Sequence, residues 1–503
     1  MNAYEALLAR TKETMLIGTS AAILNWDMQT YMPPKGTQQR GEQMATLGRI
    51  IHRMSTSEEV GKLINEADRI IKPDDILRMR NIYLLRKQYD EATKLHEDLV
   101  AAISKQRTVT SNIWRKSKPA GDWKSFQPEL QKMVDLSVER AEALLEVKNT
   151  TTIYDALIDD FEPRMTSAEI SKAFNELRPP LVKLTKKLTN ATENIDEGIT
   201  KRNIPIEIQR VLASKVANLI GYDTESDKSG GRIDEVPHPF TIGYYDDVRI
   251  TIRYSESNPV SAILTILHEA GHALYEQNLN QEWKYQPVGF AASFGIHESI
   301  SRFYENIIGR SIEFWDYYLP ILNDIANNVF TDVDTATIVR AINLVRPSKI
   351  RVSADEVTYS LHIIIRFEIE RDLFSGKIDV SELPQVWNQK YEDYLGVTFN
   401  NDGEGVMQDS HWSDGFFGYF PSYALGNIYG GMWLKELDKD LPEWRDGVIN
   451  GAIEPATNWL VEKIMSKSNL YNPSDLMYQI TGGKLTAEPF ISYLENKYSS
   501  LFN

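Results

Sequence analysis

The sequence predicts a mainly α-helical protein, and two observations carry this prediction. Apolar residues recur at three- and four-residue spacing through most of the chain, as they do on the buried face of an amphipathic helix. Strict alternation of apolar and polar residues, which is typical of a strand, is confined to the short stretch 248–254. With 503 residues, 42% of them hydrophobic, the chain has ample material for a large core. We expect one domain over residues 1–503, in which 1–200 would form a helical cover and 201–503 the functional part.

The first 200 residues contain the longest helical patterns. Pro- and Gly-marked segments at 32–36 and 119–121 predict breaks between helices, whereas Pro179-Pro180 either ends a helix or kinks a continuing one. His52 and His96 fall on these patterns and are interpreted as surface or packing residues. The helices expected in this part cover residues 2–26, 41–54, 75 to about 116, 124–147 and 167–192.

A polar loop and the predicted strand follow. Residues 224–243 are rich in Gly, Pro and polar side chains, so we expect them to form a loop. In 248–254, Val248, Ile250, Ile252 and Tyr254 alternate with polar residues. The free edge of this strand could pair with an extended peptide backbone. The alternative is a small hairpin that only closes the fold.

Residues 258–280 combine a helix signal with His268-Glu269-Ala270-Gly271-His272, an H-E-x-x-H motif. Two histidines four residues apart lie on one face of a helix, so both imidazoles can reach one metal ion. Neutral imidazoles suit zinc, and a carboxylate that does not bind the metal, here Glu269, can accept a proton from water beside it. The alternative interpretation is a pair of core histidines on an amphipathic helix.

A third ligand is expected on the next helical pattern, 294–307. Glu298 lies there among apolar residues, where a buried carboxylate is costly unless it is paired or bound to a metal. Two histidines and a distant glutamate form the ligand set of zinc sites that leave the fourth position open to water. Glu276 and Glu305 are alternative ligands, and His297 is interpreted as a neighbour of the metal site or a substrate contact.

The remaining chain returns to helical patterns around one irregular segment. Residues 401–431 are rich in glycine, aromatic and acidic residues, which is too irregular for one helix and typical of a loop that lines a site. Its candidate hydrogen-bond donors are His411 and Tyr423, whereas His362, among apolar neighbours, is interpreted as a packed residue. We expect helices over 314–329, 335–345, 352–374, 432–437, 442–463 with a break at Pro455, and 487–498.

Composition excludes several classes of protein. A formal net charge of −16 argues against nucleic acid as a partner, because the phosphate backbone would be repelled. The chain has no cysteine, so disulfides are absent and any metal must be held by His, Asp or Glu. The N-terminus lacks the order of a signal peptide, and no apolar run is long enough to cross a membrane. We therefore expect a cytoplasmic protein that binds neither nucleic acid nor membrane.

A series of short motifs occurs in order along the whole chain: Trp26-Asp27, Met32-Pro33-Pro34, His238-Pro239-Phe240, Asp247-x-Arg249-x-Thr251, H-E-x-x-H, His297-Glu298-Ser299, Ile350-Arg351-x-x-Ala354-Asp355 and Gly405-x-x-Gln408-Asp409-x-His411-Trp412. In these motifs the chain resembles the Taq-type metallocarboxypeptidases, a family of zinc-dependent gluzincin peptidases. The resemblance implies an elongated helical body with a deep active-site groove, a small β-sheet next to the zinc helix, and a homodimer. It also implies release of single residues from peptide C-termini with broad side-chain tolerance.

The resemblance supports Zn²⁺, one ion per chain, as the cofactor, with Co²⁺ or another divalent ion as a substitute. The metal ligands would be His268, His272 and Glu298. Glu269 would act as general base toward the attacking water and then deliver the proton to the leaving amine. The oxyanion formed from the attacked carbonyl would need a positioned donor, for which His411 and Tyr423 are the candidates.

Substrate binding is expected to depend on three further residues. Arg351 would recognise the free terminal carboxylate, because a guanidinium fits that group bidentately. Its alternative role is a structural ion pair with Asp355 or Glu356. The resemblance further implies that Arg249 helps to restrict substrate length, and His238 would either contact substrate or brace the loop before the strand.

Two other functions remain open from the residues alone. A zinc oligopeptidase or endopeptidase would carry the same H-E-x-x-H motif, so only Arg351 and the family resemblance distinguish it. A helical binding protein with a structural metal is the alternative from another class. The intact Glu269 argues against it, because a purely structural metal has no use for that carboxylate.

Overall fold

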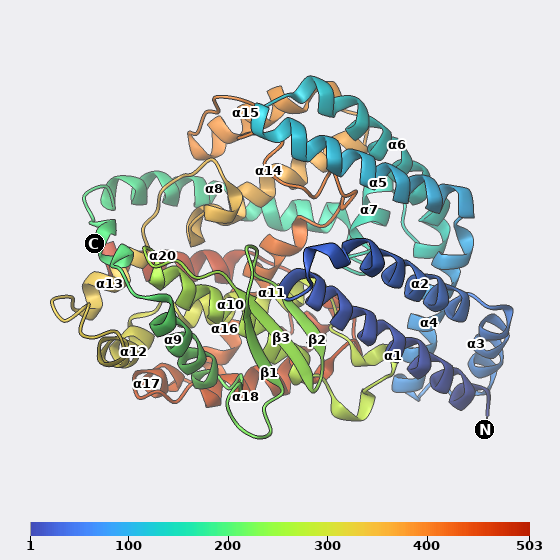
Figure 1. The fold of residues 1–503 in the computed structure, drawn as a ribbon, viewed down its shortest axis with the longest axis horizontal. Helices are drawn as coiled ribbons and strands as arrows, with labels where there is room; N and C mark the ends of the chain where they lie inside the picture. Colours follow the sequence, from blue (N-terminus) through green and yellow to red (C-terminus); the bar gives the residue numbers. More distant parts are fainter. Residues whose placement is uncertain (1, 503) are drawn as a thin grey trace.

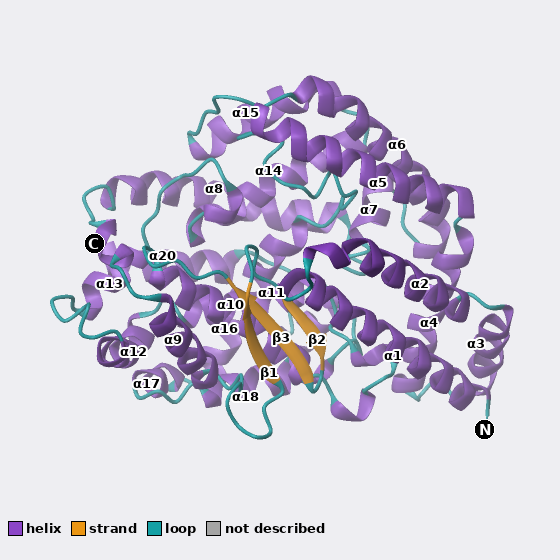
Figure 2. Cartoon of the chain, in the orientation of Figure 1, coloured by secondary structure: helices purple, strands orange, loops and turns teal. Residues whose placement is uncertain are grey.

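The structure is a computed structural model that describes residues 2–502, and this part of the chain confirms the mainly helical class (Figures 1 and 2). The two described ends of the chain lie at opposite sides of the molecule (Figure 1). No helix within residues 2–502 combines the length and apolar character that a membrane span requires. The first ten helices are α1 Ala3–Thr30, α2 Thr37–Ser55, α3 Glu58–Ile70, α4 Ile76–Lys94, α5 Glu97–Ser117, α6 Trp123–Lys148, α7 Ile153–Ile158, α8 Ser167–Ala191, α9 Ile206–Leu219 and α10 Pro259–Gln277. The others are α11 Phe294–Arg302, α12 Ile312–Ile325, α13 Thr335–Ile342, α14 Glu356–Phe374, α15 Leu383–Leu395, α16 Pro421–Asp440, α17 Trp444–Ile449, α18 Glu454–Lys463, α19 Pro473–Thr481 and α20 Glu488–Phe502.

The sheet has three strands, β1 Gly231–Glu235, β2 Thr241–Tyr244 and β3 Asp247–Ile252, in the order β1-β3-β2. β1 pairs parallel with β3, and β2 pairs antiparallel with it. The predicted strand is therefore central, and the prediction that it offers a free edge is wrong. The edge strands are β1 and β2, and residues of β2 line the cavity described below. The loop predicted over 224–243 is also wrong in part, since it contains β1 and most of β2, whose short pairings with β3 leave little trace in the sequence.

The structure decides two helix boundaries in the N-terminal half, one that the sequence analysis missed and one that it left open. The helix predicted over 75–116 is two helices, because α4 ends at Lys94 and His96 caps α5 by accepting a hydrogen bond at Nδ1 from the Asp98 backbone (3.4 Å). At Pro179-Pro180 the helix does not end, and α8 continues through both prolines.

The N-terminal helices form a cover with its own small core. α1, α3 and α4 contribute seven buried apolar side chains that form a cluster separate from the main core of the protein. α2 packs on α1 and buries none of its own residues completely. The members of the small cluster are Tyr4, Leu7, Val60, Ile64, Ala67, Ile82 and Leu85.

The C-terminal end of α1 is attached to the outer face of the sheet. Trp26, which is buried, lies between two guanidinium groups, with its ring centroid 4.8 Å from Arg232 and 4.4 Å from Arg249. The Tyr31 hydroxyl donates to Asp234 Oδ1 of β1 (2.6 Å). Cation–π contacts and one charge-assisted hydrogen bond thus connect the cover to the sheet.

Three helices, α10, α11 and α16, pack together in the main core, and glycines let them approach closely. α11 packs against α10 on one side and most extensively against α16 on the other. A Cβ at Gly271 of α10 would lie 2.8 Å from Ser301 Cα, and one at Gly426 of α16 would lie 2.7 Å from Glu298 Cγ. Both distances are too short for a larger residue, so glycine at these positions places α11 directly between its neighbours.

The irregular segment predicted over 401–431 is wrong from residue 421 onward. Residues 401–420 form turns and bends, but α16 begins at Pro421 and continues through Gly426, Gly430 and Gly431 to Asp440. Glycines normally disfavour a helix interior. Here Gly426 and Gly431 meet Glu298 and the Phe490 backbone at distances that exclude a side chain, so tertiary packing outweighs the intrinsic propensity.

Candidate metal centre and active-site groove

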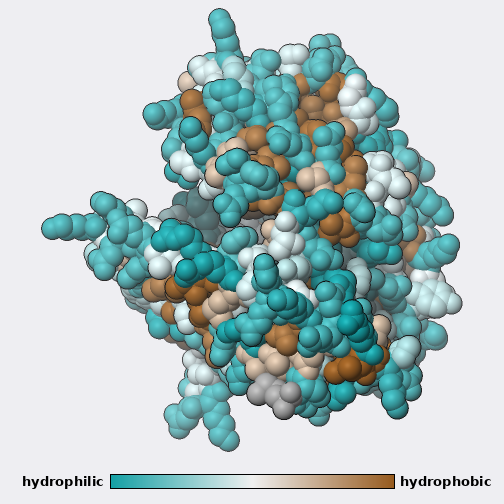
Figure 3. Space-filling view, turned by 90° about the vertical axis from the view of Figure 1, so that its right-hand side faces the viewer, coloured by the Kyte–Doolittle hydropathy of each residue, from teal (hydrophilic) through white to brown (hydrophobic). Residues whose placement is uncertain are grey.

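A cavity of about 1060 Å³ lies beside the H-E-x-x-H helix. Its walls come from β2, α10, α11, the start of α14, the segment 351–354 and the start of α16. The space-filling view shows the molecule hollowed between an upper and a lower mass, with a largely hydrophilic rim (Figure 3). A cleft of this size with charged groups at its floor is typical of an active site.

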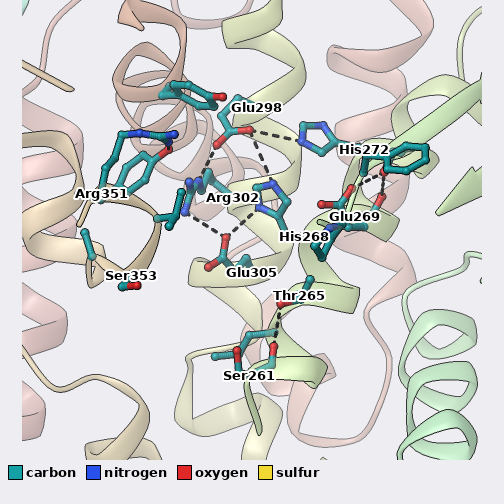
Figure 4. Close-up of a pocket in the computed structure, with 18 of the residues that line it drawn as sticks. Ser261, Thr265, His268, Glu269, His272, Glu298, Arg302, Glu305, Arg351 and Ser353 are labelled. Carbon is teal, nitrogen blue, oxygen red and sulfur yellow. Dashed lines mark hydrogen bonds and ion pairs between the residues drawn. The ribbon is translucent and has the colours of Figure 1, made fainter. Parts of the chain in front are cut away.

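His268, His272 and Glu298 point toward one another at the floor of this cavity (Figure 4). One ligand atom from each lies within 4.8 Å of the other two. Glu298 Oε2 is 3.4 Å from His272 Nε2 and 3.9 Å from His268 Nε2. In a tetrahedral zinc site, bonds of about 2.0–2.2 Å separate the ligand atoms by roughly 3.3–3.6 Å. The three residues therefore fit a metal ion of this kind with only small side-chain movements.

The carboxylate of Glu305 orients His268. Its Oε2 lies 2.9 Å from His268 Nδ1, which leaves Nε2 to face the cavity. Glu305 is held in turn by Arg302 Nη1 (3.1 Å) and lies in a π-helical turn, Phe303–Ile308, that follows α11. π-helical turns are frequent at functional sites. This geometry does not support Glu305 as an alternative metal ligand, because its carboxylate contacts His268 Nδ1, the ring nitrogen that faces away from the cavity.

Arg302 also holds the second oxygen of the third ligand. Its Nε donates to Glu298 Oε1 (2.7 Å), so Oε2 is the atom directed at the histidines. Burial opposes ionisation of Glu298, but Arg302 and His268 outweigh it and hold its pKa below the usual range. A carboxylate that stays ionised is the form that binds a cation.

His272 is connected to a carboxylate through another histidine. Its Nδ1 lies 2.6 Å from His297 Nδ1, and His297 Nε2 lies 3.0 Å from Glu276 Oε1. With Glu276 accepting from His297 Nε2–H, His297 Nδ1 accepts from His272 Nδ1–H, and the lone pair of His272 Nε2 is left for a metal. Burial lowers the pKa of His272 to about 3, which keeps the ring neutral. Glu276, the other alternative ligand, thus supports a ligand rather than replacing it, and His297 is a neighbour of the site as expected.

Glu269 lies next to the ligands and is almost fully buried. Burial raises the pKa of its carboxyl, while His268 and a hydrogen bond from Thr241 act in the opposite direction. The Thr241 hydroxyl lies 2.6 Å from Glu269 Oε2 and 3.0 Å from the Glu269 backbone carbonyl. A poised carboxylate beside an open metal position can accept and return a proton.

Arg351 lines the cavity and forms an ion pair, but not with the residues expected from the sequence. Its Nε and Nη2 donate to Asp409 Oδ1 (3.0 and 2.8 Å), and Arg366 occupies the other oxygen of the same carboxylate. The alternative of a pair with Asp355 or Glu356 is wrong. Asp355 caps α14, and Glu356 pairs with Lys497.

One carboxylate between two guanidinium groups leaves this corner of the cavity positively charged. The ring of Tyr423 lies 5.0 Å from the Arg351 guanidinium, and the Tyr359 hydroxyl accepts from Nη1 of Arg351 (3.3 Å). The aromatic rings confine the guanidinium without neutralising it. The arrangement suits recognition of an additional carboxylate.

The two predicted donors do not lie equally close to the cavity. Tyr423 lines it, whereas His411 lies behind Tyr423, with its Nε2 3.5 Å from the Tyr423 hydroxyl. Burial lowers the pKa of His411 to about 4, so the ring is neutral near neutral pH. Within residues 2–502 its Nδ1 has no hydrogen-bond partner.

His238 and Arg249 lie outside the cavity lining. His238 is exposed before β2, and Arg249 contacts Trp26 and pairs with Asp247 (2.7 Å). His362, by contrast, is completely buried, as its apolar neighbours suggest.

Several functional contacts were not foreseen from the sequence. Arg302 follows Glu298 by one helical turn, so helical spacing could have placed the two side by side. The contact of Asp409 with Arg351 joins segments 58 residues apart. Thr241 reaches Glu269 from a strand to a helix, and no local pattern signals that pairing.

Comparison with known proteins agrees with this geometry. The family model described as carboxypeptidase Taq (M32) metallopeptidase matches residues 6–498. The chain is 36% identical to thermostable carboxypeptidase 1 of Thermus thermophilus over 99% of each chain. It is 38% identical to carboxypeptidase 1 of Bacillus subtilis, over 96% of this chain and 95% of the relative. The crystal structure of an M32 carboxypeptidase from Deinococcus radiodurans superimposes with a TM-score of 0.95 at 31% identity, covering 99% of both chains. The match covers nearly the whole chain, and His268, His272 and Glu298 converge as a metallopeptidase requires. The chain therefore belongs to the carboxypeptidase Taq (M32) family of metallopeptidases.

Proposed function

We propose that this carboxypeptidase binds one Zn²⁺ through His268, His272 and Glu298 and releases single residues from peptide C-termini with broad side-chain tolerance. The observation that carries the proposal is the approach of three ligand atoms at the cavity floor, with Glu269 beside them. Two imidazoles and a carboxylate are the donor set of zinc peptidases. Co²⁺ or another divalent ion would fit the same donors.

The chemistry supplied by zinc when bound here is polarisation of the scissile carbonyl and acidification of a water molecule. Glu269 accepts the proton of the attacking water and transfers it to the nitrogen of the leaving residue. The buried position of Glu269 supports this role, because a carboxylate in a dry site is a stronger base than one in bulk water. Glu305 and His297 hold the rings of His268 and His272 in place.

The substrate is held at both ends of the scissile bond. Arg351 binds the terminal carboxylate, and the excess positive charge of the Arg351, Arg366 and Asp409 cluster favours that anion. The hydroxyl of Tyr423 donates to the developing oxyanion, and His411 behind it fixes the direction of that hydroxyl. β2, as the edge strand that lines the cavity, offers backbone groups to an extended peptide.

The experiment offers one peptide with a free C-terminus and the same peptide with an amidated C-terminus. Mass spectrometry follows the products, and elemental analysis measures zinc per chain, for wild type and Glu269→Gln. We expect one zinc per chain in both proteins, hydrolysis only by wild type, and preference for the free C-terminus. Equal cleavage of both peptides would favour an oligopeptidase or endopeptidase, and bound metal without any hydrolysis would favour a structural metal.

The remaining predictions from the resemblance are proposed on the same basis. The 503 residues act as one functional unit, and the protein is a cytoplasmic homodimer. Arg249 restricts substrate length, and its stacking on Trp26 supports an effect through the position of the N-terminal cover. His238 contacts the extended part of longer substrates at the rim, a role that its exposure supports.

A further inference from the structure

The motifs His238-Pro239-Phe240 and Asp247-x-Arg249-x-Thr251 meet at one point of the sheet. Phe240 lies opposite Thr251, one residue beyond the last pair of the β2–β3 ladder. The Thr251 backbone N–H donates to the Phe240 carbonyl (2.9 Å). The Phe240 N–H donates to the Thr251 hydroxyl (2.8 Å), and this hydroxyl donates to the Phe240 carbonyl (3.0 Å). A buried side chain thus fixes both polar groups of the Phe240 backbone.

The next residue along the chain, Thr241, contacts the proposed general base. Its hydroxyl lies 2.6 Å from Glu269 Oε2. Among residues 2–502, hydrogen bonds reach only this oxygen of the Glu269 carboxylate, so Oε1 has none. Figure 4 shows Glu269 beside His268 and His272, and Thr241 also lines this cavity.

We infer that Thr251 and Thr241 are positioning residues for Glu269: Thr251 fixes the backbone of Phe240, and the Thr241 hydroxyl then holds one carboxylate oxygen so that the other faces the attacking water. This inference rests on the proposed role of Glu269 as general base. It gives the two motifs a shared purpose that neither residue type reveals alone, since among residues 2–502 neither threonine hydroxyl forms a hydrogen bond with His268, His272 or Glu298.

The geometry explains why a hydroxyl is needed at both positions. A Glu side chain has three rotatable torsions, and among residues 2–502 the Thr241 hydroxyl is the hydrogen-bond donor to the Glu269 carboxylate. A hydrogen bond to one oxygen removes the freedom of the last torsion and orients the other oxygen. The Thr241 hydroxyl must itself be held in place to orient the carboxylate. Thr241 lies at the end of the edge strand β2, so a contact beyond the β2–β3 hydrogen bonds is needed to fix it. The Thr251 hydroxyl supplies that hold by replacing a backbone acceptor at the end of β2.

The test compares Thr241→Val, Thr241→Ser and Thr251→Val with wild type. Valine keeps the shape of threonine and removes the hydroxyl, whereas serine keeps the hydroxyl. Thr189→Val on α8 is the matched control, because among the described residues the Thr189 hydroxyl bonds only to the Thr185 carbonyl within its own helix (2.8 Å). For each protein, kcat and KM are measured on a short peptide with a free C-terminus, and the Kd for zinc is measured by competition with a chromophoric chelator.

We expect Thr241→Val to lower kcat by about 10- to 100-fold, because misorientation of a catalytic group by a fraction of an ångström to 1 Å has effects of this size. KM and the zinc Kd should stay within roughly threefold of wild type, as should every constant of Thr241→Ser and Thr189→Val. Thr251→Val should lower kcat in the same direction with an unchanged zinc Kd.

Four results would overturn the inference. The first is a kcat of Thr241→Val within threefold of wild type, and the second is an equal loss of kcat in Thr241→Ser. The third is a loss of kcat/KM in Thr241→Val that comes wholly from KM. The fourth is a weaker affinity of Thr241→Val for zinc that accounts for its loss of activity. A folded Thr251→Val protein with wild-type kcat would remove Thr251 from the arrangement. Failure of the proposed function itself is recognised separately, because Glu269→Gln would then hydrolyse the peptide as fast as wild type.

Discussion

Replacing Arg351 by methionine should remove the preference for a free C-terminus and leave the rest of the groove in place. Of the two Asp409 carboxylate oxygens, Arg351 donates to Oδ1, while Arg366 Nε donates to Oδ2 (2.7 Å). The substitution therefore does not leave a buried carboxylate without a partner. Methionine also keeps most of the apolar stem that packs beside Tyr423.

The expected loss follows from the contacts that a guanidinium makes with a carboxylate. A hydrogen bond to a charged group contributes about 1.5–3 kcal/mol, and part of a bidentate pair is offset by desolvation. A net loss of about 2–4 kcal/mol corresponds to a roughly 30- to 1000-fold lower kcat/KM for a peptide with a free C-terminus. The amidated peptide carries no charge there, so its kcat/KM should change by less than about threefold.

The assay measures kcat/KM for the free-acid and amide forms of one peptide with wild type, Arg351→Met and Arg86→Met. Arg86 is a matched control, because it pairs with Asp68 on the N-terminal cover and lies outside the cavity lining. The ratio of the two kcat/KM values should collapse in Arg351→Met alone. An equal loss for both peptides would refute the reasoning, since the guanidinium would then act on something other than the terminal carboxylate.

Three further predictions follow from other contacts. Glu305→Gln should raise the Kd for zinc by about 10- to 100-fold, because His268 Nδ1 loses its carboxylate partner. Competition with a chelator measures this Kd. An unchanged Kd would count against the role of Glu305 in orienting His268. Removing the metal with a chelator should abolish peptide hydrolysis, and added Zn²⁺ should restore it. If elemental analysis finds no metal and the protein still hydrolyses the peptide, a metal-dependent mechanism is excluded. Burial raises the pKa of Glu370 to about 7, so the folded protein binds this proton more tightly than the unfolded chain. The contribution of Glu370 to the free energy of unfolding is complete below about pH 4.5 and falls by on the order of 3 kcal/mol as the pH rises to 7. Thermal unfolding of Glu370→Gln should show a weaker dependence on pH across this window, and an identical slope in both proteins would contradict the assignment.

Local sequence patterns predict most helices and the convergence of the three candidate ligands well, because both depend on spacing along one element. His268 and His272 share a helix face by their four-residue separation, and Glu298 lies on the apolar pattern of the next helix. The interpretation of 294–307 as one helical pattern differs only at its end, where the chain forms a π-helical turn.

The features that were missed depend on contacts between distant segments. α16 contains three glycines, Gly426, Gly430 and Gly431, which make the segment look irregular in the sequence, and the close approach of Glu298 and Phe490 explains Gly426 and Gly431. The central position of β3 depends on β1, which has no alternating pattern of its own. Asp409 lies far from Arg351 along the chain, so the nearby acids Asp355 and Glu356 were the obvious but wrong partners.

The network that holds the ligands has a consequence for the distribution of charge in the site. Four carboxylates, those of Glu269, Glu276, Glu298 and Glu305, lie in the cavity wall near Arg302 and Arg310, whereas Arg351 lies in the positively charged corner that it shares with Arg366 and Asp409. When all four carboxylates are ionised, Arg302 and Arg310 balance only two of them. The part of the wall around the histidines therefore attracts a cation, while the Arg351 corner attracts an anion, so opposite charges are separated within one cavity.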